Sequence, residues 1–324
     1  MSEPRQKFLR KQDWYEFLSS QGQQVNGDDL RALRYACYKD IEQLRQRPLL
    51  VYAAKFVDAN LPPQAPISID LGDVDGFTEL IGSIKAKDKS VDVLIHSPGG
   101  RPDATERIVN LLRPRFTNVT FLVPHSAYSA ATMLALSGDE VIMHPSAVLG
   151  PIDPQINGIP ARSIKRGFDK IQQKIKEKGP EALPAYIPLI EKYSLELLEL
   201  CEDSEKLSKE LVTGWLSDHM LSSNEKSKKL DKAVDYLASY DTHLLHSRPL
   251  TIKKLSGLGL NVKTAEQELS DLLWEAYTLL DGFFNASPFV KIFESTNGIS
   301  WGKQFAQVQL VQPPQLTPTQ PNGV

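Results

Sequence analysis

The 324-residue sequence contains little cysteine, and Cys37 and Cys201 are the only two. Two cysteines cannot form the disulfide framework that stabilises small secreted proteins, and both lie in sequence of helical character. We therefore expect two free thiols in a reducing compartment.

Long hydrophobic runs are also missing, since no window approaches the roughly 18 apolar residues that a membrane-spanning helix requires. The N-terminal segment, MSEPRQKFLRKQDWYEFL, carries charges where a secretory signal needs its apolar region. These two absences predict a soluble protein of the cytoplasm without membrane insertion.

Neither sign of charge is in excess, because 37 Lys and Arg residues stand against 40 Asp and Glu residues, which gives a net charge of -3. The basic surplus typical of nucleic-acid-binding proteins is therefore absent. The glycine motifs GxGxxG and GxxxxGK(S/T) of nucleotide-binding proteins do not occur, and no Cys or His residues have the spacing of zinc ligands. We expect no cofactor, no metal and no nucleic-acid partner.

The residues that are present have an ordinary globular composition with 41% hydrophobic residues, and their spacing predicts helices in the first 47 residues. Strands and helices then alternate. The predicted strands cover 48–54, 67–71, 91–95, 118–123, 141–143 and 147–149. The predicted helices among them cover 76–85, 104–112 and 129–136. This alternation predicts an α/β fold, with helices packed outside a parallel sheet.

Helix dominates the second half of the sequence. The expected elements, in order, are a charged helix (162–178), a long helix (186–221), a polar loop or helix end (222–232), a helix (264–284), a strand (289–293) and a disordered Pro-rich tail (312–324). No internal repeat interrupts this order.

The segment Ser97-Pro98-Gly99-Gly100 follows a predicted strand and precedes a predicted helix. Ligands collect at the carboxyl edge of a parallel sheet, and paired glycines let backbone N–H groups approach a ligand closely. Such groups can hold a phosphate, a carboxylate or a developing oxyanion. A tight strand-to-helix turn without a ligand explains the same residues equally well.

Ser129 stands at the start of the predicted helix 129–136. Serine is a preferred N-cap, so a structural role is the first explanation. It can also be a nucleophile raised into a cleft, where the helix dipole and the next backbone N–H favour negative charge.

Asp153 lies between two prolines, Pro151 and Pro154. Prolines fix the backbone on either side, which suits a turn that aims one carboxylate. The same carboxylate can instead stabilise its own turn through a backbone hydrogen bond. The residues alone leave both roles open.

Taken together, three stretches resemble the serine dehydrogenase proteinase (SDH) family, the Clp-fold serine proteinases of the Clp-protease/crotonase superfamily. They are VLIHSPGG (93–100), AYSAATMLALSGDEVIMHPSAVLGPIDPQI (127–156) and HSRPLTIKKLSGLGL (246–260). The resemblance implies an α/β, Clp/crotonase-like fold of repeated β-β-α units with added N-terminal and C-terminal helices. It also implies a proteinase domain over 48–262, preceded by a helical extension (1–47) and followed by a helix and strand (263–311).

The resemblance implies roles for individual residues as well. Ser129 matches the family's nucleophile. Gly99, Gly100 and Ala130 match the positions whose backbone N–H groups form the oxyanion hole.

The general base stays open at this point. The family's Ser, Asp, His order fits Asp153 and His246. Clp peptidases place a His about two dozen residues after the nucleophile, where this sequence has an aspartate, and a carboxylate of ordinary pKa is a poor base for a hydroxyl. His243 can contact the same cleft if its stretch is helical. Lysines are the bases of membrane-associated relatives, and the candidates here are Lys165, Lys170 and Lys192.

We predict an ATP-independent serine peptidase that acts on peptides or unfolded proteins. A non-catalytic Clp-fold scaffold is the main alternative, and a crotonase-like acyl-CoA enzyme is a further one that needs no serine nucleophile. Clp-fold proteins commonly assemble, so the resemblance implies a homo-oligomer. The helix 186–221 can form its contact or simply face the core, through an apolar stripe of Leu189, Tyr193, Leu197 and Leu200.

Overall fold

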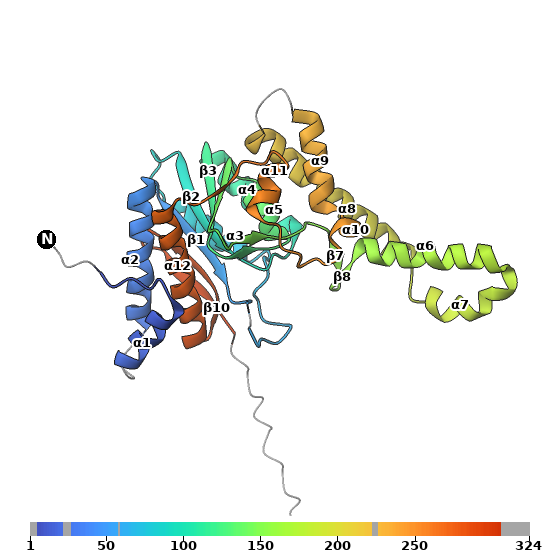
Figure 1. Cartoon of the computed structure of the whole chain (residues 1–324), viewed down its shortest axis with the longest axis horizontal. Helices are drawn as coiled ribbons and strands as arrows, with labels where there is room; N and C mark the ends of the chain where they lie inside the picture. The colour runs from blue at the N-terminus through green and yellow to red at the C-terminus, as the bar shows by residue number, and fades with distance from the viewer. Residues whose placement is uncertain (1–4, 22–26, 58, 222–225, 306–324) are drawn as a thin grey trace, which may run out of the picture.

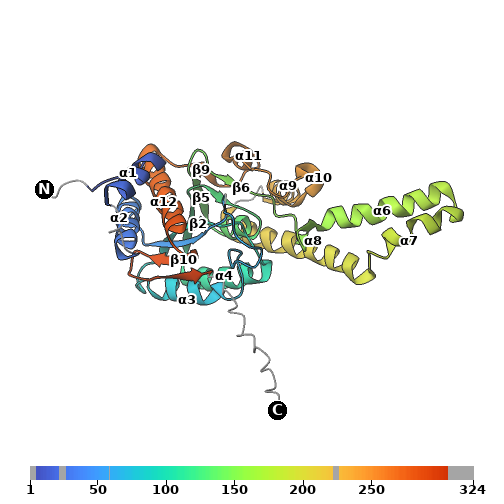
Figure 2. The same ribbon diagram turned by 90° about the horizontal axis from the view of Figure 1, so that it is seen from below.

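The computed structural model describes residues 5–21, 27–57, 59–221 and 226–305 (Figure 1). The Pro-rich tail 312–324, which we predict to be disordered, lies outside the described residues, as does the first part of the predicted loop 222–232. The described chain forms a body around a central sheet, and a helical arm extends from that body (Figures 1 and 2).

Seven strands form the central sheet. In order across it they are β11 (Ser300–Gln304), β10 (Phe289–Ser295), β1 (Leu49–Ala54), β2 (Ser90–His96), β3 (Asn118–Val123), β5 (Glu140–Met143) and β9 (Val262–Thr264). The strands from β1 to β9 are parallel, whereas β10 and β11 pair antiparallel. Because parallel strands end at the same edge, the carboxyl ends of β2, β3 and β5 lie together, where ligand sites form in such sheets.

Helices cover both faces of the sheet (Figure 2). One face carries α1 (Lys11–Gln21), α2 (Gly27–Arg45) and α12 (Gln267–Ala286), and the other carries α3 (Asp73–Gly82), α4 (Pro102–Arg115) and α5 (Ala130–Leu136). Alternate residues of β2 serve the two faces, since Leu94 packs with the first group and Val93 and Ile95 with the second. The strands therefore need the near-continuous apolar runs seen in the sequence.

Short strands beside the central sheet explain the turns at its carboxyl edge. β4 (Ser126–Ala127) follows β3 and pairs with β6 (Val148–Leu149), which follows β5. Ser97, directly after β2, forms a bridge with Ala127. Three central strands thus continue into a second small layer before the next helix. This is the repeated β-β-α unit of the predicted Clp-like α/β fold, and the predicted fold class is confirmed.

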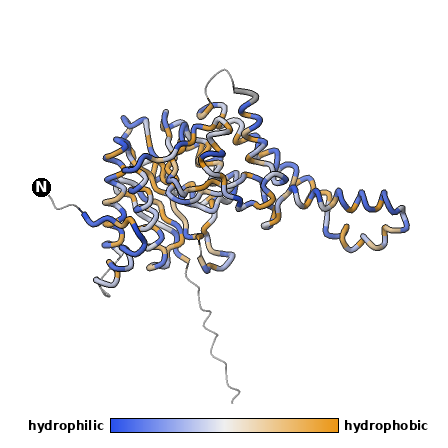
Figure 3. The backbone as a smooth tube through the Cα atoms, viewed as in Figure 1, coloured by the Kyte–Doolittle hydropathy of each residue, from blue (hydrophilic) through white to orange (hydrophobic). Residues whose placement is uncertain are grey.

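The arm consists of α6 (Ala161–Lys178), α7 (Leu183–Ile190) and the start of α8 (Leu195–Trp215), and its tip lies away from the sheet (Figures 1 and 2). α8 returns to the body and packs against α5 and α9 (Lys226–Ala238). Every residue of α7 is at least partly exposed, although its sequence, LPAYIPLI, is largely hydrophobic (Figure 3). The remaining short elements are β7 (Gln155–Ile156), β8 (Ile159–Pro160), a π-helical turn (Leu216–Met220), α10 (Tyr240–His243) and α11 (Ile252–Gly257).

Two predicted elements are wrong, and the described part of the predicted loop or helix end 222–232 forms the start of α9. The segment 67–71 is not a strand, because a single bridge joins Ile69 to Gly100. The predicted helix 186–221 is broken after Ile190, and a new helix begins where Ser194 accepts the N–H of Leu197 at 3.1 Å. The Ser194 cap thus starts a separate helix within a pattern that the apolar spacing alone does not interrupt.

Candidate active site

The turn Ser97–Gly100 lies directly against the start of α5. Gly99 has a φ of +94°, a conformation that side chains rarely adopt. A Cβ atom at Gly99 would lie 2.4 Å from the carbonyl oxygen of Tyr128 and 2.9 Å from the nitrogen of Ala130. Glycine alone permits this contact, which brings the end of β2 next to the residues that follow β4.

Two backbone N–H groups at this junction, those of Gly100 and Ala130, have no hydrogen-bond acceptor within the described ranges. The N–H of Gly99, in contrast, donates to Ser97 Oγ at 3.2 Å. The carbonyl oxygen of Gly99 accepts the N–H of Ile69 at 2.7 Å. Gly99 therefore permits the close contact, while Gly100 and Ala130 retain donors for a ligand.

Ser129 immediately precedes α5 in a strained conformation. Its φ of 51° and ψ of -122° lie outside the regions that non-glycine residues favour. Its side chain makes no capping hydrogen bond to α5, all of whose residues are described. The N-cap role suggested by the sequence is therefore wrong, and the hydroxyl lines a cleft instead.

Asp153 and His246 form a hydrogen-bonded pair. The Nδ1 atom of His246 lies 3.0 Å from the Oδ1 atom of Asp153. Asp153 is buried, whereas the His246 side chain is 21% exposed. An ionised carboxylate can only accept, so this bond requires a proton on Nδ1, and in the neutral imidazole the lone pair then lies on Nε2.

One cleft of about 420 Å³ collects the predicted residues. Ser129, Gly99, Gly100 and His246 all line it, and Asp153 lies behind the imidazole, outside the lining. The imidazole rather than the carboxylate therefore faces the cleft. The weak basicity of a carboxylate is therefore no objection to an aspartate at position 153, because the group that faces the cleft is an imidazole.

The alternative bases lie elsewhere. Lys170 and Lys192 are exposed on the arm, and Lys165 pairs with Glu205 at 3.1 Å. The Nε2 atom of His243 lies 2.6 Å from the carbonyl oxygen of Tyr236. Burial lowers the pKa of His243 below its ordinary value. The cleft lining includes none of these lysines and not His243.

The sequence reasoning missed several residues of the cleft. Met133 and Ile152 contribute buried apolar surface, and Arg101 lies near the glycine turn. Met133 lies four positions after Ser129, so helical spacing predicts that both share one face of α5. No local signal identifies the contributions from α8, which depend on tertiary packing: Ser204, Leu207 and Ser208.

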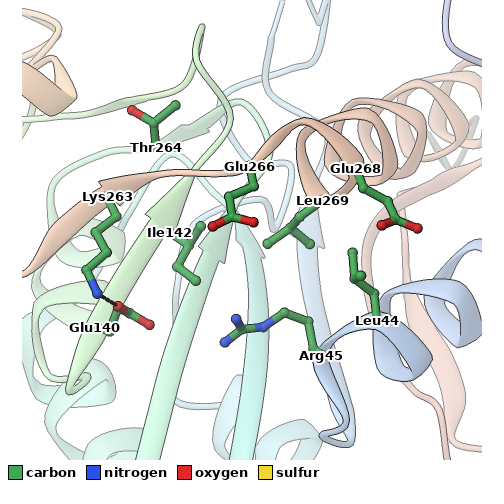
Figure 4. Close-up of a pocket in the computed structure, with 9 residues that line it drawn as sticks. All are labelled: Leu44, Arg45, Glu140, Ile142, Lys263, Thr264, Glu266, Glu268 and Leu269. Carbon is green, nitrogen blue, oxygen red and sulfur yellow. Dashed lines mark ion pairs between the residues drawn. The ribbon is translucent and has the colours of Figure 1, made fainter.

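A second cavity, of about 360 Å³, lies between the end of α2 and the start of α12, over β5 and β9 (Figure 4). Glu140 and Lys263 form an ion pair there at 2.6 Å, and Arg45 pairs with Asp92 at 2.7 Å. The lining drawn in Figure 4 has one hydroxyl, that of Thr264, and no imidazole or thiol. This cavity therefore lacks an activated nucleophile.

Comparison with known families identifies the family of this chain. Residues 68–283 match the ClpP-like SDH-type serine proteinases, and this match covers more than half of the chain. The chain belongs to this family. The resemblance noted in the sequence is thus confirmed, and the chemistry of the family is serine proteolysis.

Two relatives in Methanocaldococcus jannaschii carry no assigned function in their names. The uncharacterized protein MJ1495 is 30% identical over 193 residues, which are 59% of this chain and 59% of that protein. The uncharacterized protein MJ0137 is 30% identical over 210 residues, which are 64% of each chain. The chain therefore spans less than two thirds of the length of these curated relatives.

Two solved structures are also similar. A mutant of the 1510-N membrane-bound stomatin-specific protease is 19% identical, with a TM-score of 0.35 over 62% of this chain and 77% of that one. A mutant of ClpP1 from Listeria monocytogenes is 13% identical, with a TM-score of 0.38 over 71% of this chain and 98% of that one. At these scores the likeness supports no functional inference. Among the described residues, no helix combines the length and apolar character needed to cross a bilayer.

Proposed function

We propose that this protein is a serine peptidase in which Ser129 is the nucleophile, His246 the general base and Asp153 the group that orients His246. The supporting observation is the 3.0 Å hydrogen bond from His246 Nδ1 to Asp153 Oδ1. It is made by an imidazole that lines the same cleft as Ser129. This division of roles recurs in Ser-His-Asp enzymes of unrelated folds.

In the proposed mechanism, Ser129 Oγ attacks the carbonyl carbon of the peptide while its proton passes to Nε2 of His246. The buried Asp153 carboxylate holds the ring in the required tautomer and stabilises the imidazolium that forms. The tetrahedral intermediate then expels the amine, which takes the proton from Nε2. Water hydrolyses the remaining acyl-enzyme by the same proton transfers.

The negative charge of the tetrahedral intermediate develops on the former carbonyl oxygen. In this proposal the N–H groups of Gly100 and Ala130 bind that oxygen, since neither has an acceptor within the described chain. Gly99 belongs to the same oxyanion hole because it permits the close contact with Ala130. Losing one such donor typically costs about 10²- to 10³-fold in rate.

We propose peptides or unfolded segments as the substrates, cleaved without ATP. The cleft of about 420 Å³ has buried apolar surface at Met133 and Ile152, which suits a side chain of the substrate. We also propose a homo-oligomer in which the exposed apolar residues of the arm form the contact.

The first experiment is labelling of the purified protein with a fluorophosphonate probe, followed by location of the adduct by mass spectrometry. We expect one adduct on Ser129, and none in Ser129→Ala or His246→Ala. Asp153→Asn should slow labelling by about 10²- to 10⁴-fold, because it removes the group that fixes the tautomer. Lys170→Ala and Lys192→Ala, at exposed positions of the arm, should label like the wild type.

Other outcomes reassign the roles. If Lys170→Ala or Lys192→Ala abolished labelling, a Ser–Lys dyad would replace the triad. If the folded wild type gave no adduct, the protein would be a non-catalytic scaffold, with the glycines and Ser129 retained for shape.

A further inference from the structure

A buried ion cluster lies behind the glycine turn, and the mechanism above does not use it. Lys291 of β10 and Asp73 of α3 are both 0% exposed. The Nζ atom of Lys291 lies 2.9 Å and 2.8 Å from the two carboxylate oxygens of Asp73. Lys303 adds a second ammonium group, 2.7 Å from Asp73. Burying such charges is costly and adds little net stability compared with apolar packing.

One chain of contacts leads from this cluster to the N–H of Gly99. The hydroxyl of Tyr52, a residue of β1, donates to Asp73 Oδ2 at 2.8 Å. The buried side chain of Ser97 lies near that hydroxyl. Ser97 Oγ in turn accepts the N–H of Gly99 at 3.2 Å. Tyr52 pairs with Ile95 across β1 and β2, which places Ser97 two residues further along the same face.

A second chain of contacts leads to the carbonyl group of Gly99. Lys291 Nζ donates to the carbonyl oxygen of Ser68 at 2.7 Å. The next residue, Ile69, donates its N–H to the carbonyl oxygen of Gly99 at 2.7 Å and accepts the N–H of Arg101 at 2.9 Å. The ion cluster is therefore connected to both sides of Gly99.

The second chain of contacts fixes the direction of a catalytic donor. The carbonyl group of Gly99 and the N–H of Gly100 belong to one planar peptide unit, which is trans. In a trans peptide these two groups point in opposite directions. Since the carbonyl oxygen of Gly99 points at Ile69, the N–H of Gly100 points away from Ile69. Gly100 itself lines the cleft.

We propose that Lys291, Asp73 and Tyr52 are positioning residues that hold the turn Ser97–Gly100 so that the N–H of Gly100 faces the oxyanion. This inference rests on the proposed peptidase function and deepens it. The cluster touches no substrate atom in this scheme. It acts through Ser97 and Ile69, and its effect belongs to the rate of the chemical step rather than to binding.

The test compares two buried tyrosines. Tyr52→Phe keeps the ring and removes only the hydroxyl of the cluster. Tyr38→Phe is the matched control, because Tyr38 is 1% exposed and donates to a buried carboxylate, Glu294, at 3.0 Å, on the other side of the sheet. Both variants lose one buried hydrogen bond, so both should lose similar stability in thermal unfolding.

The readout is the labelling of Ser129 by a fluorophosphonate probe over a range of probe concentrations. We expect Tyr52→Phe to lower the limiting labelling rate about tenfold, because the donor is displaced but not removed. The probe concentration that gives half of this rate should not change. Tyr38→Phe should change neither quantity. Equal limiting rates in Tyr52→Phe and Tyr38→Phe would overturn the inference while leaving the peptidase proposal intact.

Ser97→Ala gives a second and independent variant, which carries the test alone if Tyr52→Phe does not fold. It removes the acceptor of the Gly99 N–H and should slow labelling to a similar extent. The double variant should be no slower than the slower single one, because both act on one chain of contacts. The inference would be contradicted if Ser97→Ala were labelled at the wild-type rate. It would also be contradicted if the losses of labelling rate in the double variant were purely additive. An unlabelled wild type would instead overturn the proposed function, and this inference with it.

Discussion

Two residues of the proposed triad are held in states that cost free energy. Ser129 has a positive φ, and Asp153 Oδ2 is buried without a hydrogen-bond partner within the described residues. Backbone strain of this kind costs on the order of 1–3 kcal/mol, and an unsatisfied buried acceptor costs a similar amount. Such costs persist where the surrounding fold imposes them, and they concentrate at functional sites. Both residues here belong to the proposed triad.

Burial of His96 makes the stability of the protein depend on pH. Burial, together with the nearby charge of His125, lowers the pKa of His96 from 6.5 to about 3. The unfolded chain therefore binds a proton near pH 6.5 that the folded chain does not bind. The contribution of the neutral His96 side chain to stability is complete above pH 6.5. It is lost as the pH falls toward 3, by about 1.4 kcal/mol per pH unit.

Urea unfolding between pH 7 and pH 5 measures this loss. We expect the free energy of unfolding to fall with pH, and His96→Gln to reduce the slope by about one proton. His243, whose pKa burial also lowers, should retain its own share of the slope. An unchanged slope in His96→Gln would show that His96 takes up its proton in the folded state.

Single residues also show what the sequence can predict about the site. Ser129, Asp153 and His246 can be found from motif and order, because their types and spacing are characteristic. Their roles cannot be found that way. Whether a serine before a helix caps that helix depends on its φ and ψ angles. The local sequence pattern predicts neither angle. Which imidazole faces the cleft, His243 or His246, likewise depends on how a loop returns to the sheet.

At the scale of elements, the sheet is predicted by apolar runs of strand length that alternate with segments of helical spacing. Long apolar runs such as 91–95 and 118–123 become central strands because both of their faces are covered. Short strands are not predictable in this way. β9 owes its pairing to β5, more than a hundred residues earlier in the sequence, and the segment around Ile69 pairs through only one bridge.

The contact between the glycine turn and α5 can be tested by adding one methyl group. In Gly99→Ala the new Cβ would lie 2.4 Å from the Tyr128 carbonyl oxygen and 2.9 Å from the Ala130 nitrogen, so the turn and the helix must separate. We expect Ser129 labelling by a fluorophosphonate to fall at least 100-fold, as for loss of an oxyanion donor. Stability should fall by roughly 2–3 kcal/mol.

Gly158→Ala is the matched control for this experiment. Gly158 has a φ of +79°, but a Cβ there meets no atom within 4 Å. The substitution should therefore cost only the backbone strain, about 1–2 kcal/mol, with labelling unchanged. Equal labelling of Gly99→Ala and Gly158→Ala would mean that the close approach at Gly99 has no part in the reaction.

At the scale of the whole molecule, the arm stands out because several of its large apolar side chains are exposed. The exposed fractions of Ile187, Leu189, Leu195 and Leu200 are 43%, 44%, 77% and 49%. Two of them, Leu189 and Leu200, belong to the stripe that the sequence predicts, but the break at Ser194 places them on different helices. Apolar residues clustered on a projecting element mark an interaction surface. The arm also carries opposite charges, since α6 is rich in Lys and Arg and α8 begins with several Glu residues, of which Lys165 and Glu205 pair within one chain.

A second copy of the chain satisfies both features of the arm, because a symmetric contact can bring the basic α6 of one copy to the acidic α8 of another. We expect light scattering after size exclusion to give a multiple of the 36.2 kDa chain mass. Ile187→Glu combined with Leu195→Glu should reduce this mass toward that of one chain, because two buried carboxylates would face the contact. Tyr15→Glu, at a residue 57% exposed on α1, should leave the mass unchanged. A wild-type mass near 36.2 kDa would rule out the assembly.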